Sequence, residues 1–388
     1  MNHEPFLSPL DEEQRLFRAS MGEAVERTSP LQRRQTLDKS KTFDDALHGV
    51  LAGLGVLGVG VPEALGGSGG GAVEQVVALE VLGRTATSMG VFGVVQYMNT
   101  RLLRDFGSAE QQERYLAPLV RGEIKSAFCL TEAGGGTDVL AAMHTRAEPS
   151  GTGWRLTGNK MWISGAVRAD VMIVLARTAE HRSRGVSMFL VPGDAPGVTV
   201  HELDTFAING LDTCSVHFDE VALSPDQVLG GENEGFMHVL STLNGERLNG
   251  AAVAIGIGMG ALEAAVDYAR ERQAFGRPIG QFQAVQHRLV QAGVALQGAW
   301  LTTLQAARMD HAGEALDVAS SMAKLAASKA ATRATDVGME TLGGAGFDLD
   351  LPLQRYYRDI RLYTFAPVVD DMLNNLLGER WLNLPRSF

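Results

Sequence analysis

The chain reads Ala127-Phe-Cys-Leu-Thr-Glu-Ala-Gly-Gly-Gly-Thr-Asp138 where its pattern changes from helical to β-rich. The apolar run from Ala127 to Leu130 predicts a strand, which leads into Thr131, three consecutive glycines and Thr137. Glycines let backbone N–H groups approach an anion without interference from a Cβ atom, and the two hydroxyls add hydrogen-bonding groups. Taken alone, the segment fits either an ordinary tight turn or the phosphate cradle of a cofactor.

The regions on either side of this segment predict an α+β fold in three parts. Apolar residues recur at the helical period in eight stretches, at 11–27, 43–54, 73–82, 111–120, 236–243, 246–272, 282–309 and 320–342. Short β-type runs separated by turn residues lie at 154–156, 171–176, 187–191, 198–201 and 214–218. We therefore predict an N-terminal helical domain (1–123), a central antiparallel β-barrel domain (124–232) and a C-terminal four-helix bundle (233–388).

Length, charge and cysteine content restrict the class of protein. A chain of 388 residues exceeds what one hydrophobic core usually organises. Its net charge of −11 argues against nucleic-acid or anionic-membrane binding, so an acidic substrate would need a local basic patch. Cys129 and Cys214 lie in apolar stretches, which favours buried free thiols and a reducing compartment. We expect a cytoplasmic protein without membrane insertion, because no window approaches 18 uninterrupted apolar residues, and we predict no metal site.

From about residue 11 to residue 382, the order of regions and motifs resembles the acyl-CoA dehydrogenase family of flavoproteins. The segment 127–138 is similar to the family's first flavin signature, with Thr137 in place of a serine. The other similar stretches are Val61-Pro-Glu-Ala-Leu-Gly-Gly-Ser-Gly-Gly70, Leu156-Thr-Gly-Asn-Lys-Met-Trp-Ile-Ser164, Arg272-Gln-Ala-Phe-Gly-Arg-Pro-Ile-Gly-Gln-Phe-Gln283, Leu342-Gly-Gly-Ala-Gly-Phe347 and Arg358-Asp359. Each motif is weak by itself, but together and in order they indicate the family.

The resemblance implies that the chain binds FAD in a site shared between subunits of a homotetramer or homodimer. In the family's arrangement, Trp162 would pack on the isoalloxazine ring and Ser164 would lie near its reactive nitrogen. The implied cofactor residues are Phe128, Leu130, Thr131, Gly136, Thr137, Trp162, Ser164, Glu340, Gly343 and Gly344, with Arg272, Phe275 and Gln283 reaching the FAD of a neighbouring subunit. From the residues alone, Trp162 also fits a core aromatic, and Arg272 fits a cation at a helix C-terminus.

Two positions depart from the family's pattern. Glu340 stands where glutamine is usual, and a carboxylate accepts but does not donate a hydrogen bond, so the adenine-side contacts would differ. Counted from Arg358-Asp359, Pro367 stands where many members have the catalytic glutamate of Ile-Tyr-Glu-Gly-Thr-x-Glu. Proline has neither the carboxylate nor the backbone N–H that would polarise the thioester carbonyl. Pro367 also fits the N1 position of a last helix, with Asp370 and Asp371 in its first turn.

The family's reaction is α,β-desaturation of an acyl thioester, in which a carboxylate removes the α-proton and hydride leaves the β-carbon for the flavin. A second branch, with the isovaleryl and long-chain enzymes, carries its base just before an arginine on the first long C-terminal helix. Leu243-Asn-Gly-Glu-Arg-Leu248 is similar, so Glu246 is the candidate base. Arg247 and Thr137 are candidate substrate contacts. Glu-Arg at a helix start is also a common dipole-favoured pair, and Asp370 and Asp371 are weaker candidates because their offset turns them away.

Three functions stay open at this point. The first is FAD-dependent dehydrogenation of an acyl-CoA or acyl-carrier-protein thioester by Glu246, with an electron-transfer flavoprotein or oxygen as acceptor. The second is different chemistry on the same fold, such as desulfination, elimination, oxidation or oxygen-dependent hydroxylation, which the loss at Pro367 would favour. The third is a flavin-binding, non-catalytic subunit of a hetero-oligomer.

Overall fold

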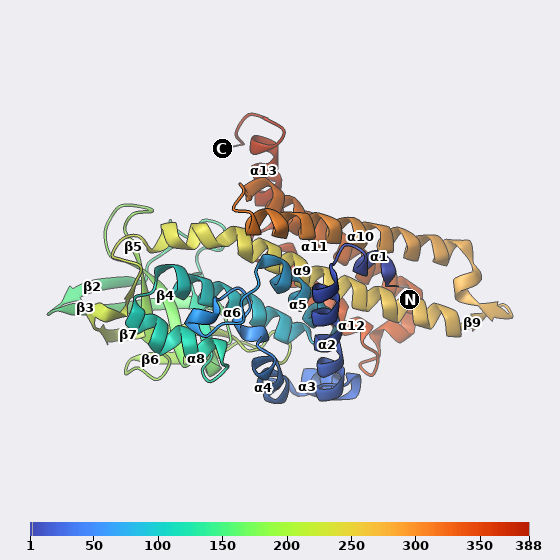
Figure 1. Cartoon of the computed structure of the whole chain (residues 1–388), viewed down its shortest axis with the longest axis horizontal. Helices are drawn as coiled ribbons and strands as arrows, with labels where there is room; N and C mark the ends of the chain where they lie inside the picture. Colours follow the sequence, from blue (N-terminus) through green and yellow to red (C-terminus); the bar gives the residue numbers. More distant parts are fainter. Residues whose placement is uncertain (2, 388) are drawn as a thin grey trace.

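The computed structural model describes residue 1 and residues 3–387 of the chain. A sheet occupies one end of an elongated molecule, and long helices extend from it to the other end (Figure 1). The central helix is α9 (Gly235–Glu271), which packs against helices from both halves of the sequence: α5 (Ala72–Thr85), α6 (Thr87–Phe106), α10 (Gln283–His311), α11 (Asp317–Leu342) and α12 (Leu353–Asp359). This arrangement confirms the predicted α+β class, with helical regions before and after a central sheet.

Helix α9 is long and apolar enough to cross a membrane by length and composition alone. However, 83% of its apolar 18-residue window is buried inside the protein. Small residues allow this close packing, because a Cβ atom at Gly256 would collide with the backbone of α5, and one at Gly258 would stand 2.6 Å from the Leu296 side chain. Helix α9 is therefore packed as a core helix.

The N-terminal region contains the predicted helices and two further long ones. Besides α5 and α6 its helices are α1 (Glu4–Leu7), α2 (Glu12–Thr28), α3 (Leu31–Ser40), α4 (Asp45–Gly53), α7 (Ala109–Gln111) and α8 (Ala117–Val120). The prediction missed α3 and α6. Helix α6 is buried over most of its length, and its residues 87–100 carry no charged side chain that would mark an exposed face in the sequence.

The central region forms one eight-stranded sheet, in the order β6-β7-β3-β2-β4-β5-β8 with β1 beside β4. Its strands are β1 (Ser126–Cys129), β2 (Arg146–Ser150), β3 (Gly153–Ser164), β4 (Val171–Arg177), β5 (Val186–Pro192), β6 (Val198–Glu202), β7 (Thr213–Leu223) and β8 (Val228–Leu229). Both cysteines are free and buried in its core, as predicted.

The predicted closed antiparallel barrel is wrong. Strands β1 and β2 pair with β4 in parallel, and within the described residues β6 and β8 end the sheet without pairing to each other. The two halves of the sheet meet through a single β2–β4 pair, Arg146 and Arg177. Side chains from both halves, such as Phe218 of β7 and Phe189 of β5, share one apolar core. Packing of the two halves over this core replaces closure by hydrogen bonds.

The C-terminal region is helical, as predicted, and it ends in α13 (Asp370–Arg380). The helices predicted at 236–243 and 246–272 are a single helix, α9. A hairpin of β9 (Gln273–Ala274) and β10 (Arg277–Pro278) joins α9 to α10. The domain boundaries at 123/124 and 232/233 stay a prediction.

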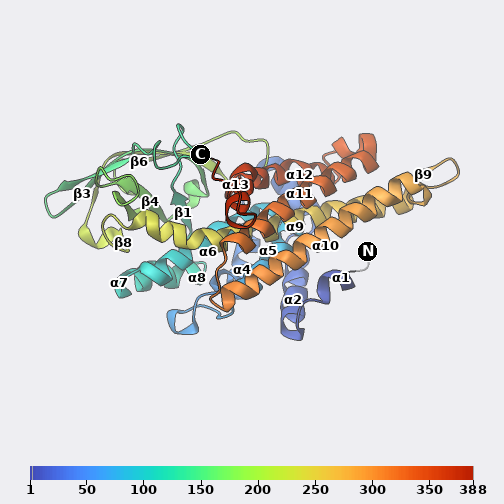
Figure 2. The same ribbon diagram turned by 90° about the horizontal axis from the view of Figure 1, so that it is seen from above.

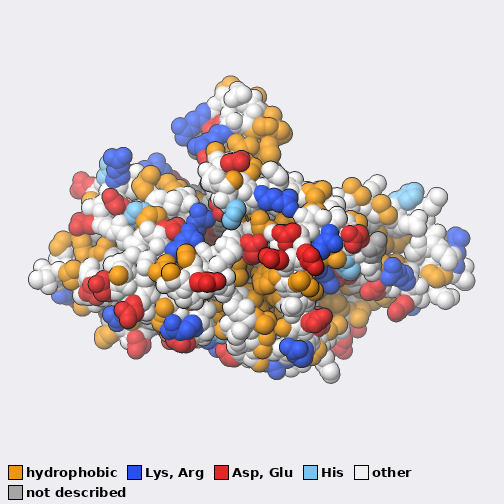
Figure 3. All heavy atoms as spheres, in the orientation of Figure 1, with side chains coloured by type: hydrophobic (Ala, Val, Ile, Leu, Met, Phe, Trp, Pro, Cys, Tyr) orange, Lys and Arg blue, Asp and Glu red, His pale blue; other side chains and the backbone are white. Residues whose placement is uncertain are grey.

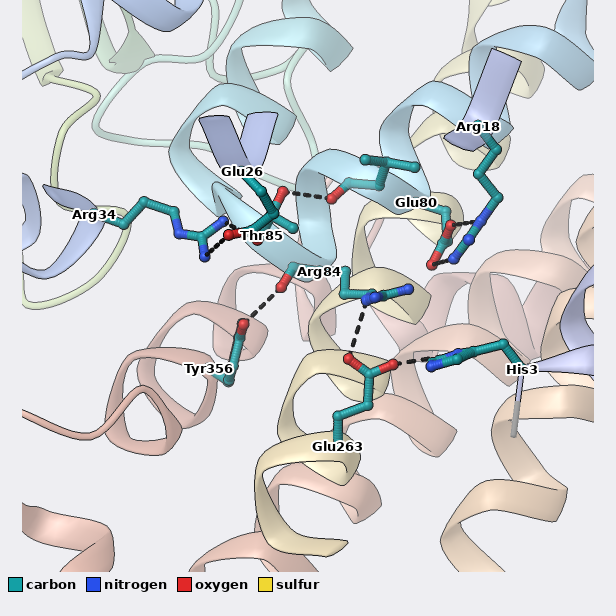
Figure 4. A network of polar contacts seen from close by, with 10 residues as sticks. His3, Arg18, Glu26, Arg34, Glu80, Arg84, Thr85, Glu263 and Tyr356 are labelled. Atoms are coloured by element: carbon teal, nitrogen blue, oxygen red, sulfur yellow. Dashed lines mark hydrogen bonds and ion pairs between the residues drawn. The ribbon is translucent and has the colours of Figure 1, made fainter. Parts of the chain in front are cut away.

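A network of partly buried charges joins α2, α5 and α9 (Figure 4). Arg18 donates to both carboxylate oxygens of Glu80, at 2.8 and 3.0 Å. Arg84 Nε lies 3.0 Å from Glu263 Oε2, and the Tyr356 hydroxyl donates to the Arg84 carbonyl oxygen at 2.6 Å. Because both carboxylates have arginine partners, the network holds the N-terminal helices on α9 without an unpaired buried charge.

Candidate active site

The residues after β1 are fixed to β3 by a ladder of short contacts. The Thr131 hydroxyl donates to the Met161 carbonyl oxygen at 2.6 Å, and the Met161 N–H donates to the Thr131 carbonyl oxygen at 2.9 Å. The buried ammonium group of Lys160 donates to the Leu130 carbonyl oxygen at 2.9 Å and to Glu132 at 3.0 Å. The hydroxyl proton of Thr131 is therefore engaged within the chain, and its oxygen is left as an acceptor.

Glu132 continues this ladder toward the next loop. Its carboxylate accepts hydrogen bonds from the backbone N–H groups of His144 at 2.8 Å and Thr145 at 3.0 Å. Burial opposes its ionisation, but the Lys160 ammonium and these N–H groups outweigh burial, so the Glu132 pKa is lowered. The sequence analysis missed Lys160 and Glu132. Their signal is the charge that each places beside buried strand residues, inside the two flavin-like motifs.

Trp162 is exposed on the sheet rather than buried in its core. It lies at an irregularity in the pairing of β3 with β7, has a backbone φ of 64°, and is 59% exposed. A positive φ is costly for a tryptophan and is typical of functional positions. Gly136 and Thr137 are also exposed, and a Cβ atom on Gly136 would meet no atom within 4 Å. Ser164 ends the same strand. The interpretation of Trp162 as a core aromatic is thus wrong.

A second group of predicted cofactor residues lies at the opposite end of the molecule. The hairpin that carries Phe275 is far from the sheet in both views (Figures 1 and 2). Phe275 is 94% exposed with a φ of 52°, Arg272 caps the C-terminus of α9, and Gln283 is exposed at the first turn of α10. One chain therefore does not bring these residues to Trp162.

The remaining predicted cofactor residues are exposed at the end of α11. Cβ atoms on Gly343 or Gly344 would meet nothing within 4 Å, so the backbone is open to an approaching group. The Glu340 carboxylate is paired with Arg288 at 3.0 Å and lies 3.9 Å from Arg333. The carboxylate that replaces the usual glutamine is thus neutralised by two arginines that the sequence analysis missed.

Glu246 lies on α9, half-buried, and none of the described residues hydrogen-bonds to its carboxylate. Burial raises the pKa of Glu246 to about 7, and the neighbouring Arg247 only partly opposes this. Arg247 is itself buried, 9% exposed, and donates to Asn244 Oδ1 at 2.8 Å, while its Nε has no partner in the described part of the chain. Asn244 in turn donates to Asp317 at 2.9 Å. Arg247 is therefore not a solvated surface arginine.

Pro367 lies in the segment before α13 and packs against α9, one helical turn beyond Glu246. A Cβ atom on Gly250 would stand 2.9 Å from the Pro367 Cδ atom. Helix α13 begins at Asp370, with Val369 as its N-cap, so the prediction of Pro367 at N1 is wrong.

The two aspartates after Pro367 are not placed as bases. Asp370 is buried, and its carboxylate accepts from Lys324 at 2.9 Å and from Ser328 at 2.9 Å, with Lys329 at 3.3 Å. Asp371 is exposed in the first turn of α13. Lys324 was not predicted, because it is one of several charged residues of α11 and only its buried partners distinguish it.

Comparison with known proteins places the chain in a family. The N-terminal, middle and C-terminal domain profiles of acyl-CoA dehydrogenases match residues 11–123, 127–221 and 233–382. The human mitochondrial short-chain specific acyl-CoA dehydrogenase is 36% identical over 332 residues, which cover 84% of this chain and 80% of that protein.

Two solved structures show the same fold. One, described as the electron transferring flavoprotein of Acidaminococcus fermentans in a study of electron bifurcation, has a TM-score of 0.92 at 30% identity and covers 96% of this chain and 98% of its own. The other, PigA with FAD and proline, has a TM-score of 0.89 at 27% identity and covers 97% and 98%. The chain belongs to the acyl-CoA dehydrogenase family. It is an FAD-dependent oxidoreductase that acts on CH–CH groups.

Proposed function

We propose that this enzyme desaturates an acyl thioester and that Glu246 is the base that removes the α-proton. The observation that carries the proposal is a carboxylate on α9 without a hydrogen-bond partner among the described residues, with a pKa of about 7. A general base works best when its pKa lies near the working pH. Pro367, which stands at the usual position of the base, lies one helical turn away and offers no carboxylate.

The residues on the sheet fit the flat, amphipathic ring of FAD. The exposed indole of Trp162 offers a face for stacking, the Thr131 oxygen offers an acceptor, and the open backbone at Gly136 suits a pyrophosphate. When bound, FAD supplies the acceptor for the hydride that leaves the β-carbon. Glu246 holds the proton taken from the α-carbon, and the buried Arg247 guanidinium favours the carboxylate form of its neighbour.

We further propose that the active enzyme is a homo-oligomer, a homotetramer or homodimer, in which Arg272, Phe275 and Gln283 complete the FAD site of a neighbouring copy. The β9 hairpin lies at the opposite end of the chain from β3, the strand that carries Trp162, which supports this arrangement (Figure 1). Exposed apolar residues offer surfaces for the contact, with one set on a single face of α10 and another on the arm that projects at α13 (Figure 3): Val290, Val294 and Leu301, and Trp381, Leu382 and Leu384.

The substrate is a thioester of coenzyme A or of a carrier protein, since both present the same pantetheine arm to the flavin. The human relative named for short-chain acyl-CoA supports coenzyme A. For the electron acceptor we propose an electron-transfer flavoprotein, which the description of the Acidaminococcus structure supports, with oxygen as the alternative. We place the enzyme in the cytoplasm.

Different chemistry on the same fold is the second candidate function. The replacement of the usual base by Pro367 favours it, and so does the solved relative that is described with FAD and proline rather than with an acyl-CoA. Such an enzyme would not need Glu246 as a base.

Anaerobic addition of saturated thioesters to the purified holoenzyme distinguishes these functions. We expect butyryl-CoA or a related thioester to bleach the visible flavin band, and Glu246→Gln to abolish the bleaching while retaining FAD. A flavin that stays oxidised with every saturated thioester would contradict the proposed desaturation. Turnover that needs oxygen would favour different chemistry on the same fold. FAD bound substoichiometrically and restored by a partner chain would indicate a non-catalytic subunit.

A further inference from the structure

Lys324 anchors the segment that carries Pro367. Its side chain is 1% exposed, and its ammonium group donates to the Val368 carbonyl oxygen at 2.7 Å and to Asp370 Oδ1 at 2.9 Å. Ser328 donates to the other oxygen of Asp370 at 2.9 Å. One buried lysine on α11 therefore holds the residue directly after Pro367 and the first residue of α13.

The held segment presses Pro367 onto the face of α9 that carries Glu246. A Cβ atom on Gly250 would stand 2.9 Å from Pro367 Cδ and 3.5 Å from a ring carbon of Tyr363, so only a glycine allows this approach without a shift. Residues four apart on a helix lie on one face, about 5–6 Å apart at their Cβ atoms. Pro367 therefore packs on α9 one helical turn from Glu246, and it brings neither a carboxylate nor a backbone N–H to this face.

We propose that Lys324 is a positioning residue, which fixes Pro367 against Gly250 as an apolar wall that shields Glu246 from water. The inference rests on the proposed role of Glu246 as base. It assigns a role to Pro367: the proline at the position of the usual base would shield Glu246, the proposed base, from water.

Burial, rather than the neighbouring charges, is the main influence on the pKa of Glu246. Burial raises this pKa, and the charge of Arg247 opposes the rise. The charged or titratable groups of the surrounding elements are Arg101 of α6, which would contact a Cβ on Gly245, its partner Asp310 of α10, Asp317 and Lys324 of α11, Tyr363, and Asp370 and Arg380 of α13. Most of these are paired with one another, so loosening the wall would act on Glu246 through water.

The test measures the protonation of Glu246 directly, in the holoenzyme. The carboxylic-acid C=O band is followed by infrared difference spectroscopy over pH, and the component lost in Glu246→Gln is assigned to Glu246. We expect a midpoint near pH 7 in the wild type. In Lys324→Met we expect it to fall by at least about one unit toward the ordinary 4.5, because a freed segment admits water.

Two further variants keep the test decisive. Lys329→Met removes the exposed lysine that contacts the same Asp370, and it should leave the midpoint unchanged. Pro367→Gly removes the proline ring and leaves the Lys324–Asp370 ion pair intact. This variant therefore tests the proposal even where Lys324→Met fails to fold. It should lower the midpoint of the Glu246 titration. An unchanged midpoint in Pro367→Gly, or an equal shift in Lys329→Met, would overturn the proposal. Absence of flavin bleaching with thioesters would instead refute the proposed function and leave this titration valid.

Discussion

Pro367 packs against Gly250, so closely that a Cβ atom on the glycine would stand 2.9 Å from the proline Cδ. This contact places Pro367, which we predict to stand at the position of the family's usual base, one helical turn from the proposed base Glu246. It also makes Gly250 a position where an added methyl group is expected to be costly.

Gly250→Ala should destabilise the protein, although alanine is the better helix former. The added methyl would force Pro367 or Tyr363 to move, and overpacking of this kind costs about 1–3 kcal/mol. Gly22→Ala in α2 is the matched control, because a Cβ there meets nothing within 4 Å, and it should stabilise by roughly 0.5–1 kcal/mol. Thermal unfolding of the two variants checks this. Equal effects of both substitutions would show that the Gly250 contact is loose.

Lys160→Met should destabilise the protein and weaken FAD binding. The substitution leaves Glu132 buried without its cation, which costs about 3–5 kcal/mol, and it releases the Leu130 carbonyl oxygen. Arg155→Met on the same strand breaks the exposed pair with Glu220 and should cost at most about 1 kcal/mol. Denaturant unfolding and FAD retention are measured together. Normal FAD retention in a folded Lys160→Met protein would show that the loop after β1 does not hold the cofactor.

Glu340→Gln should raise the affinity of the apoprotein for FAD. The carboxylate is held by Arg288 and Arg333, and without it both guanidinium groups are available to the cofactor's phosphates. We expect a gain of several-fold, about 1 kcal/mol, by titration of FAD fluorescence. Asp336 lies on the same helix as Glu340 and pairs with Arg361. Its substitution Asp336→Asn breaks that ion pair and should not change the affinity for FAD. Weaker binding in Glu340→Gln would place the carboxylate itself among the FAD contacts.

The pH dependence of stability should reveal the raised pKa of Glu246. The native state binds this proton more tightly than the unfolded chain, so between the ordinary 4.5 and about 7 stability falls as pH rises. Glu246→Gln removes this loss. The variant should match the wild type below pH 4.5 and exceed it above pH 7, by about 1–2 kcal/mol after allowance for partial exposure. Parallel stability curves for the two proteins would contradict the raised pKa.

The sequence predicts the helical–β–helical order well because amphipathic periods and turn residues are local signals. Helix α6 was missed because it is largely buried and its residues 87–100 carry no charged side chain that would mark an exposed face. The sequence prediction also divided α9 at Asn244-Gly245, a pair typical of turns. The structure continues the helix there, with the Arg101 guanidinium packed over Gly245, 2.8 Å from where a Cβ would stand. Such long-range contacts leave no local signal.

The sequence predicted the motif residues of the candidate site, but it did not predict the buried lysines that hold the surrounding segments in place. Trp162 and Glu246 stand out because their surroundings in the chain resemble known signatures. Lys160 and Lys324 do not, because a buried lysine is recognised by its partners, and those lie about thirty and forty-five residues away in sequence. The barrel prediction failed for a related reason, since strand spacing does not determine which strands pair.

The pH dependence of flavin reduction tests the central claim most directly. The rate of anaerobic flavin bleaching by butyryl-CoA is measured across the pH range for the wild type and Glu246→Gln. We expect the wild-type rate to rise with pH through about 7, as the carboxylate ionises, and the variant to be slower by about 10²–10⁴-fold. A Glu246→Gln enzyme that reduces its flavin as fast as the wild type, with the same pH profile, would show that Glu246 is not the base.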